Sequence, residues 1–234
     1  MNNAEFSKEF DILYNNIMSN AAPGLDEYEK SVFLTNAQEG FVKDLYNGTG
    51  PTSFEKDEEA RRFLGELIDT FETNEKLVGH LGLSRSSMFF QIPEDVWFIT
   101  YESAVLKDER LGCANGTEAT IVPVSQDNFY KIQRNPFRGP TEGRALRLDN
   151  SDNIIELVSD YNIDKYLIRY VKRPRPIILV DLNEIDEGLS INGLSEASEC
   201  ELNPVTHRPI LERAVMLAKT AWSGGTGQEK NMFN

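Results

Sequence analysis

Residues 25–46, with the sequence LDEYEKSVFLTNAQEGFVKDLY, predict a long helix that has its own start and stop signals. Asp26 suits the N-cap position, and Glu29 follows three residues later, as in a capping box. An apolar face continues to Asn47-Gly48, a typical helix stop. Its members are Tyr28, Val32, Phe33, Val42, Leu45 and Tyr46. This helix is therefore expected to bury one face against another part of the fold.

A second helix is predicted before it. The apolar residues near the N-terminus recur at helical spacing, and Ala22-Pro23-Gly24 then breaks the pattern. They are Phe6, Phe10, Leu13, Tyr14 and Ile17. Because the connection to residues 25–46 is short, we expect the two helices to be antiparallel neighbours.

The C-terminal region predicts a third long helix over residues 206–222, THRPILERAVMLAKTAW. Thr206 suits the cap, and Pro209 lies in the first turn, where a missing N–H has no intrahelical partner in any case. Gly224-Gly225 is expected to end this helix. The polar, glycine-rich residues 223–234 are expected to form a flexible tail.

Between the helical ends, the hydrophobic period changes to that of β-strands. Short apolar or alternating runs are separated by turn signals such as Asn115-Gly116 and Asn150-Ser151-Asp152, a pattern typical of antiparallel strands joined by hairpins. A short helix over 59–68 precedes them. The expected strands are 88–92, 96–101, 120–124, 129–132, 145–148, 154–158, 166–171 and 176–180. Because prolines cannot donate to a ladder, the last strand, entered through Arg173-Pro174-Arg175-Pro176, is expected at an edge or in a crossover.

These elements predict an α+β protein with five successive parts. A helical region covers 1–70, an antiparallel β-sheet or sandwich is inserted at 71–181, and an acidic loop follows at 182–204. The C-terminal helix occupies 205–222, and the tail occupies 223–234. A chain of 234 residues suits one sizeable domain or one domain with an insertion.

Composition restricts the function. Acidic residues outnumber basic ones by 38 to 24, giving a net charge of -14, which disfavours tight wrapping of nucleic acid by the whole surface. Cys113 and Cys200 are too few for a disulfide framework and fit synthesis in a reducing cytoplasm. We expect no secretion signal and no membrane-spanning segment, because neither an apolar leader nor a long apolar run is present.

The sequence motifs that would indicate a catalytic or metal-binding site are weak. His80, His207 and the two cysteines stand singly, without the close ligand pairs typical of zinc sites. Gly224-Gly225-Thr226-Gly227 lacks the preceding strand and the Gly-Lys-Ser/Thr of a phosphate loop. Clustered carboxylates, namely Asp149 and Asp152, or Asp181, Glu184 and Asp186, are more typical of solvated turns than of a hydrolase. We therefore predict no catalytic residue, no cofactor and no metal.

Charge asymmetry is the more informative pattern. The stretch from Lys131 to Arg175 is locally basic, and Asp181 to Leu202 contains acidic residues without any Lys or Arg. Such a boundary suits a heterologous contact between unlike faces of adjacent identical subunits, which can close into a ring. Pairing within one chain, or solvation, is an equally weighted alternative. The candidate interface residues are Arg169, Lys172, Arg173, Arg175, Asp181, Glu184, Asp186, Met232 and Phe233.

Both ends of the chain resemble a structural protein family of crAss-like bacteriophages. The similar segments are FDILYNN at 10–16, preceded by Glu5-Phe6, APGLDEYEKSVFLT at 22–35, RPRPIIL at 173–179 and HRPILERAV at 207–215. The resemblance covers roughly the first and last quarters of the chain and is thin across the middle. It implies that the N-terminal helical pair and the C-terminal helix pack together as a bundle.

The resemblance also implies a function. A member of this family would be a virion protein made in the host cytoplasm, forming a ring of the tail barrel or head–tail connector below the portal. It implies a homododecamer that contacts the portal protein and other tail ring proteins, with DNA passing through the lumen without sequence-specific binding. Two other hypotheses are a small acidic hydrolase and a peptide-binding β module with helical flanks.

Overall fold

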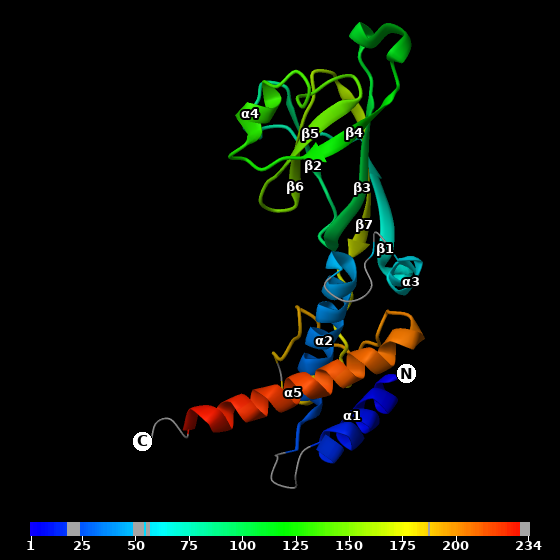
Figure 1. Cartoon of the computed structure of the whole chain (residues 1–234), viewed down its shortest axis with the longest axis vertical. Coiled ribbons are helices and arrows are strands. Elements are labelled where there is room, and N and C mark those ends of the chain that lie inside the picture. The colour runs from blue at the N-terminus through cyan, green and yellow to red at the C-terminus, as the bar shows by residue number, and fades with distance from the viewer. Residues whose placement is uncertain (18–23, 49–53, 55–56, 187, 230–234) are drawn as a thin grey trace. The chain divides into compact units, whose positions relative to one another are not determined.

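The computed structural model describes residues 1–17, 24–48, 54, 57–186 and 188–229. The chain forms two compact units. Unit 1 comprises Met1–Leu67 and Arg173–Asn234, and unit 2 comprises Ile68–Lys172. Unit 2 is thus inserted between the two halves of unit 1, and the combination of helices with a sheet confirms the predicted α+β class (Figure 1).

Unit 1 is built around three long helices: α1 (Asn3–Ile17), α2 (Glu27–Asn47) and α5 (His207–Glu229). In α2 the predicted capping box is present, because the Asp26 side chain accepts from Glu29 N and the Glu29 side chain accepts from Asp26 N. Gly48 ends α2 in the left-handed region. Of the predicted break before α2, Ala22 and Pro23 lie outside the described residues.

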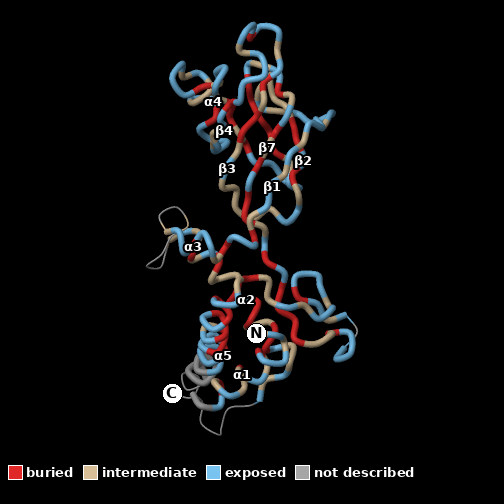
Figure 2. Tube along the Cα trace, turned by 90° about the vertical axis from the view of Figure 1, so that its right-hand side faces the viewer, coloured by how far each residue is buried: buried red, intermediate tan, exposed pale blue. Residues whose placement is uncertain are grey.

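The three helices pack together, as the predicted bundle requires. Helix α5 crosses α2 and also packs against α1 (Figure 1). The contact buries one apolar stripe from each helix completely or nearly so, which Figure 2 shows as red segments of the tube. The buried residues are Phe6, Phe10, Tyr14, Leu34, Ala37, Val42, Leu45, Ile210, Leu211, Ala214, Val215 and Ala218.

The predicted end of the last helix is wrong. Helix α5 continues through Gly224 and Gly225 to Glu229. Glycine weakens a helix by about 1 kcal/mol relative to alanine, but it ends one mainly where it takes the left-handed C-terminal conformation. A glycine pair alone is therefore a weaker stop than Gly48, which does take that conformation. Residues 230–234 of the predicted tail lie outside the described residues.

The capping box of α2 makes a testable contribution to stability. Replacing Asp26 by alanine removes the acceptor for Glu29 N and is expected to lower the free energy of unfolding by about 1 kcal/mol. Urea unfolding of the full chain measures the change. Asp26→Asn keeps an acceptor and should lose much less, whereas an equal loss in both variants would show that the cap is not responsible.

The predicted strand at 176–180 is not part of a sheet. Ile178 forms only an isolated antiparallel bridge with Ser198, and α2 side chains bind the backbone groups of the residues around it. Gln38 Nε2 donates to Arg175 O at 2.8 Å, Thr35 Oγ1 accepts from Ile177 N at 3.1 Å, and Ser31 Oγ accepts from Leu179 N at 3.0 Å. Ser31 and Thr35 are four helical residues apart, a rise of about 6 Å, which matches the roughly 6.6 Å that two strand residues span. Thr35 and Gln38 are three residues apart, a rise of about 4.5 Å. This polar ladder, defined as Ser31, Thr35 and Gln38, docks the segment on the bundle.

The acidic segment that follows is ordered by short helical turns. They are η3 (Leu182–Glu184) and η4 (Pro204–Thr206), the latter leading directly into α5. Ile178, Leu182 and Ile191 form a buried cluster against Tyr28 and Val32 of α2. The predicted acidic loop therefore has an apolar anchor on unit 1.

Unit 2 is one curled sheet of seven strands in the order β1-β7-β3-β4-β5-β6-β2. The strands are β1 (Ile68–Thr73), β2 (Ser87–Gln91), β3 (Val96–Leu106), β4 (Glu118–Pro123), β5 (Arg144–Asp149), β6 (Ile154–Val158) and β7 (Ile163–Lys172). An isolated bridge between Leu77 and Phe89 joins the segment after β1 to β2 at the opposite end of the order. The sheet therefore curls around a core that includes Phe90, Leu106 and Tyr166.

One strand pair differs from the all-antiparallel expectation. β4 and β5 pair in parallel, and the crossover between them contains α4 (Phe129–Gln133). The predicted strand at 129–132 is therefore wrong, since a parallel connection needs a long crossover that is commonly helical. Phe129 is fully buried against Leu146 and Leu148, so the same apolar run fits a helix as well as a strand.

The predicted helix at 59–68 is shorter than expected. Helix α3 (Glu58–Phe63) is followed by the 3-10 turn η1 (Gly65–Leu67), and β1 then begins at Ile68. Sequence reasoning missed β1, whose six residues pair with β7 along their full length. Buried and exposed residues do not alternate regularly along β1, because only Ile68, Phe71 and Thr73 are half-buried.

Candidate functional site

A largely buried network of charged and polar side chains lies inside unit 2. Arg147 Nη1 donates to Glu102 Oε1 at 2.5 Å, and Tyr166 donates to Glu102 Oε2 at 2.8 Å. The Glu102 and Arg147 side chains are only 8% and 12% exposed. Arg147 Nε lies 3.1 Å from Asp149 but without hydrogen-bond geometry. Because β4 separates β3 from β5, this pair ties the sheet together across an intervening strand.

The pKa values in this network follow from burial. Desolvation raises the pKa of Glu102, and the opposing charge of Arg147 limits the rise. Burial likewise raises the pKa of Tyr166. None of these three side chains lines either of the two hollows described below, and the network joins strands β3, β5 and β7 of the sheet.

Metal and nucleophile chemistry gains no support from the geometry. Over the described ranges, no group of three or more His, Cys, Asp or Glu residues could hold a metal ion. Burial raises the pKa of Cys200 to about 11, which makes its thiol a poor nucleophile. His207 is buried against Phe6, and its Nε2 lies 2.9 Å from Leu202 O. Burial lowers the pKa of His207.

The predicted basic interface residues fall into two groups. Arg169 is exposed on β7, and Lys172 is half-buried at the end of that strand. Arg173 and Arg175 belong to unit 1, where Arg173 Nη2 lies 2.7 Å from Glu39 and Arg175 Nε lies 3.5 Å from Glu201. For these two arginines the structure therefore shows the alternative of pairing within one chain.

The predicted acidic residues lie together around η3. Asp181 accepts from Asn183 N at 3.0 Å and so caps the turn. Glu184 and Asp186 are exposed, with Ile185 between them. Met232 and Phe233 lie outside the described residues. The predicted interface set is thus distributed over both units, and only its acidic part is a compact group.

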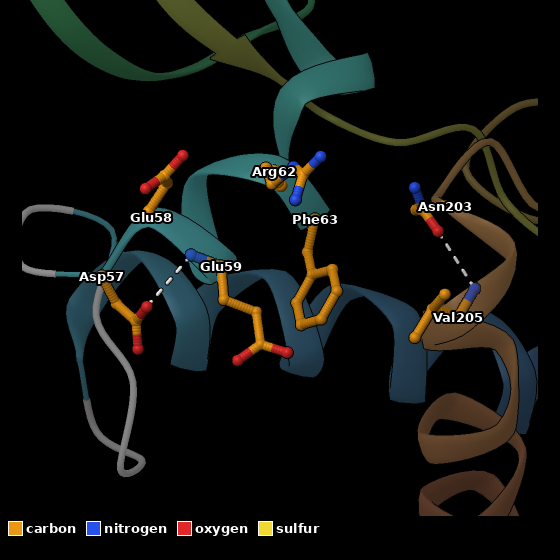
Figure 3. Close-up of a pocket in the computed structure, with 7 residues that line it drawn as sticks. All are labelled: Asp57, Glu58, Glu59, Arg62, Phe63, Asn203 and Val205. Atoms are coloured by element: carbon orange, nitrogen blue, oxygen red, sulfur yellow. Dashed lines mark hydrogen bonds between the residues drawn. The ribbon is translucent and has the colours of Figure 1, made fainter.

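A hollow of about 660 Å³ on unit 1 is lined mainly by α3 and the turn before α5 (Figure 3). Asp57 caps α3 by accepting from Glu59 N, and Asn203 accepts from Val205 N. Glu58, Glu59 and Arg62 provide charged groups, and Phe63 provides an apolar wall. Two of the polar lining groups, Asp57 and Asn203, are thus engaged in capping short helices.

A second hollow, of about 400 Å³, lies beside α4 on unit 2. Val124 and Ile132 contribute apolar lining, and Lys131 and Arg138 contribute positive charge. Sequence reasoning included these cations in the basic stretch but did not single them out as interface residues. The signal available in the sequence was the recurrence of Lys131, Arg134 and Arg138 next to the aromatic residues Tyr130 and Phe137.

Among the described residues, no helix combines the length and the apolar character needed to span a bilayer.

Comparison with known proteins identifies the family. The family model described as phage tail ring protein 3/4 matches residues 1–230. Ring protein 3 of Bacteroides phage crAss001 is 55% identical over 233 residues, covering 98% of this chain and all of that protein. Ring protein 4/5 of the same phage is 41% identical over 233 residues, covering 96% of this chain and 94% of that protein. The resemblance found at both ends thus extends across the middle, and the chain belongs to the phage tail ring protein 3/4 family, the structural ring proteins of bacteriophage virions.

Proposed function

We propose that copies of this chain form a closed ring in the phage tail, at the position that ring protein 3 occupies in its own phage. The observation that carries this proposal is the identity to ring protein 3, 55% against 41% for ring protein 4/5, with both matches nearly full length. Proteins that share a ring position keep the same neighbours above and below. Their surfaces are therefore expected to stay more alike than those of proteins from different rings.

We further propose that the ring has twelve copies and lies in the tail barrel or connector below the portal, with a lumen that passes DNA. Charge supports this role. Unit 1 holds 22 of the 38 acidic residues but only 12 of the 24 basic ones. A negative wall repels phosphate, so DNA would pass without adhering. Portal and neighbouring ring proteins would then contact the two faces of the ring.

The contact between copies is proposed to be heterologous, with a basic face of one copy against an acidic face of the next. Arg169 and Lys172 of unit 2 and the acidic residues around η3 fit this arrangement. Arg173 and Arg175 belong to unit 1, where each has a carboxylate nearby. The hydrolase and peptide-binding hypotheses gain nothing from the comparisons, which name ring proteins.

Native mass spectrometry of the purified chain, together with electron microscopy of virions, tests the proposal. We expect a closed oligomer of twelve copies and density for this chain in one tail ring below the portal. A chain that stays monomeric at all concentrations and is absent from virions would contradict the ring function. A ring of another copy number, or at the position of ring protein 4/5, would overturn only the finer assignment.

A further inference from the structure

The region around α4 carries a group of positive charges, although the protein as a whole is acidic. Lys131, Arg134 and Arg138 are exposed, and none of them forms an ion pair with any residue that the structure describes. Two aromatic side chains lie beside them, Tyr130 at 56% exposure and Phe137 at 85%. Unpaired cations next to exposed aromatic rings are typical of a protein contact. We call these five residues the α4 corner.

The α4 corner borders a hollow that is lined by both apolar and positively charged side chains. Lys131 and Arg138 both line this space of about 400 Å³, while Val124 and Ile132 give it an apolar lining. Lys131 and Ile132 are held by α4, and Val124 follows β4 with its N–H donating to Arg147 O at 2.8 Å. The hollow therefore offers burial to one apolar side chain and two cations to acidic groups beside it.

Unit 1 carries an exposed turn with the opposite pattern. Ile185 is 47% exposed and stands between the exposed carboxylates Glu184 and Asp186, and we call these three residues the acidic knob. The backbone N–H groups of Ile185 and Asp186 both donate to Leu182 O at 3.1 Å. Leu182 itself is fully buried. The knob is thus presented by an ordered turn with a buried anchor, which reduces the entropy lost on binding.

We propose that the acidic knob of one copy binds the hollow at the α4 corner of the next copy, with Ile185 against Val124 and Ile132 and the two carboxylates against Lys131 and Arg138. This inference rests on the proposed ring, and it names the surfaces that would join its subunits. The two surfaces differ, so each copy offers one of each, and the contact repeats from copy to copy until the ring closes.

Charge complementarity favours a second copy over nucleic acid as the occupant. A phosphate backbone would satisfy the cations but would leave the apolar lining of the hollow uncovered. The acidic knob matches both features, because one apolar side chain is flanked on each side by a carboxylate. The same chain carries the knob and the hollow, so no second protein is required.

A charge-reversal experiment with mixing tests the proposal on the full chain. Variant H carries Lys131→Glu and Arg138→Glu, and variant K carries Glu184→Lys and Asp186→Lys. Each variant alone places like charges at the contact, and we expect at least a tenfold loss of ring in native mass spectrometry. A mixture of H and K restores opposite charges at every contact, so it should give rings in which the two variants alternate in equal numbers.

Matched controls separate this contact from a general effect of charge. Arg85→Glu with Lys107→Glu makes the same charge change as variant H on other exposed residues of unit 2, and Glu94→Lys with Glu118→Lys matches variant K. Both controls should assemble like the wild type. Circular dichroism melting of H and K checks that each is folded before mixing.

The outcomes distinguish the contact from the ring itself. Normal rings from H or K alone, or folded variants that do not form alternating rings when mixed, would overturn the proposed contact and leave the ring function intact. Loss of nucleic-acid binding in H without loss of rings would likewise overturn it and assign the α4 corner to a nucleic acid. A wild-type chain that forms no ring under any condition would refute the proposed function itself.

Discussion

Replacing Arg147 by alanine is expected to lower the free energy of unfolding of unit 2 by about 3–5 kcal/mol, the usual loss when one partner of a buried ion pair is removed. Glu102 would keep its Tyr166 hydrogen bond but lose the cation that neutralises it. Its side chain is 8% exposed, so water cannot replace the lost partner without disturbing the sheet. Urea unfolding of the full chain at pH 7, followed by a probe for β-structure, measures the loss.

The loss should depend on pH in a definite direction. Burial raises the pKa of Glu102 in the folded protein above its ordinary value of 4.5. Such a group favours the folded state below the unfolded pKa, and that contribution is lost as pH rises through the folded pKa. Without Arg147 the folded pKa of Glu102 would rise further, because the cation lowers it. The Arg147→Ala defect should therefore be smaller at pH 5 than at pH 7.

Two variants make this test specific. Replacing both partners, Glu102→Leu with Arg147→Met, removes the uncompensated charge and should recover a substantial part of the lost stability. Arg85→Ala removes an exposed cation from the same unit and should change stability by less than about 0.5 kcal/mol. A defect that is equal at pH 5 and pH 7 and that the double variant does not relieve would show that lost packing, rather than charge, is responsible.

Replacing Thr35 by valine should destabilise unit 1 by about 2–6 kcal/mol, because two buried backbone groups lose their partner and each costs about 1–3 kcal/mol when unsatisfied. Thr35 Oγ1 accepts from Ile177 N at 3.1 Å and donates to Ile177 O at 3.3 Å, and both residues are buried. Valine has nearly the same shape, so the change isolates the hydrogen bonds. Thermal and urea unfolding followed by helical signal provide the measurement.

Thr35→Ser is the matched control for this prediction. Serine keeps the hydroxyl and loses only a methyl group, so it should cost about 1 kcal/mol, roughly the contribution of one buried carbon. Hydrogen exchange of the Ile177 amide adds a local readout, since protection should fall in the valine variant and persist in the serine variant. Equal stability of the valine variant and the wild type would show that the polar ladder does not hold the 175–179 segment.

Much of the local structure was predictable from the chain. The Asp26 capping box, the Gly48 stop and six of the seven strands correspond to elements in the structure. These features depend on residues that are neighbours in sequence, where a cap, a left-handed glycine or a two-residue period acts locally. Residues 129–132 show the limit, because four residues, of which Lys131 is charged, carry too little periodicity to separate a helix from a strand.

The candidate interface was harder to predict for a related reason. Arg173 and Arg175 are predicted to lie in a basic surface because they follow other cations in the chain. The structure places Glu39 and Glu201, which are distant in sequence, beside them. Lys131 and Arg138, in contrast, line a hollow that forms only when the crossover between β4 and β5 folds. A run of like charges does not indicate which of its members will be paired.

By itself, the sequence determined the helical ends, the β-rich middle, the acidic balance and the family, since these depend on local spacing, composition and similarity. Only the tertiary structure decided that β4 and β5 run in parallel, that Ser31, Thr35 and Gln38 bind the 175–179 segment, and that the acidic knob and the α4 corner have complementary chemistry. Each of these features joins residues far apart in the chain. Their partners are chosen by burial, by hydrogen bonding and by the geometry of the connections, which no local pattern encodes.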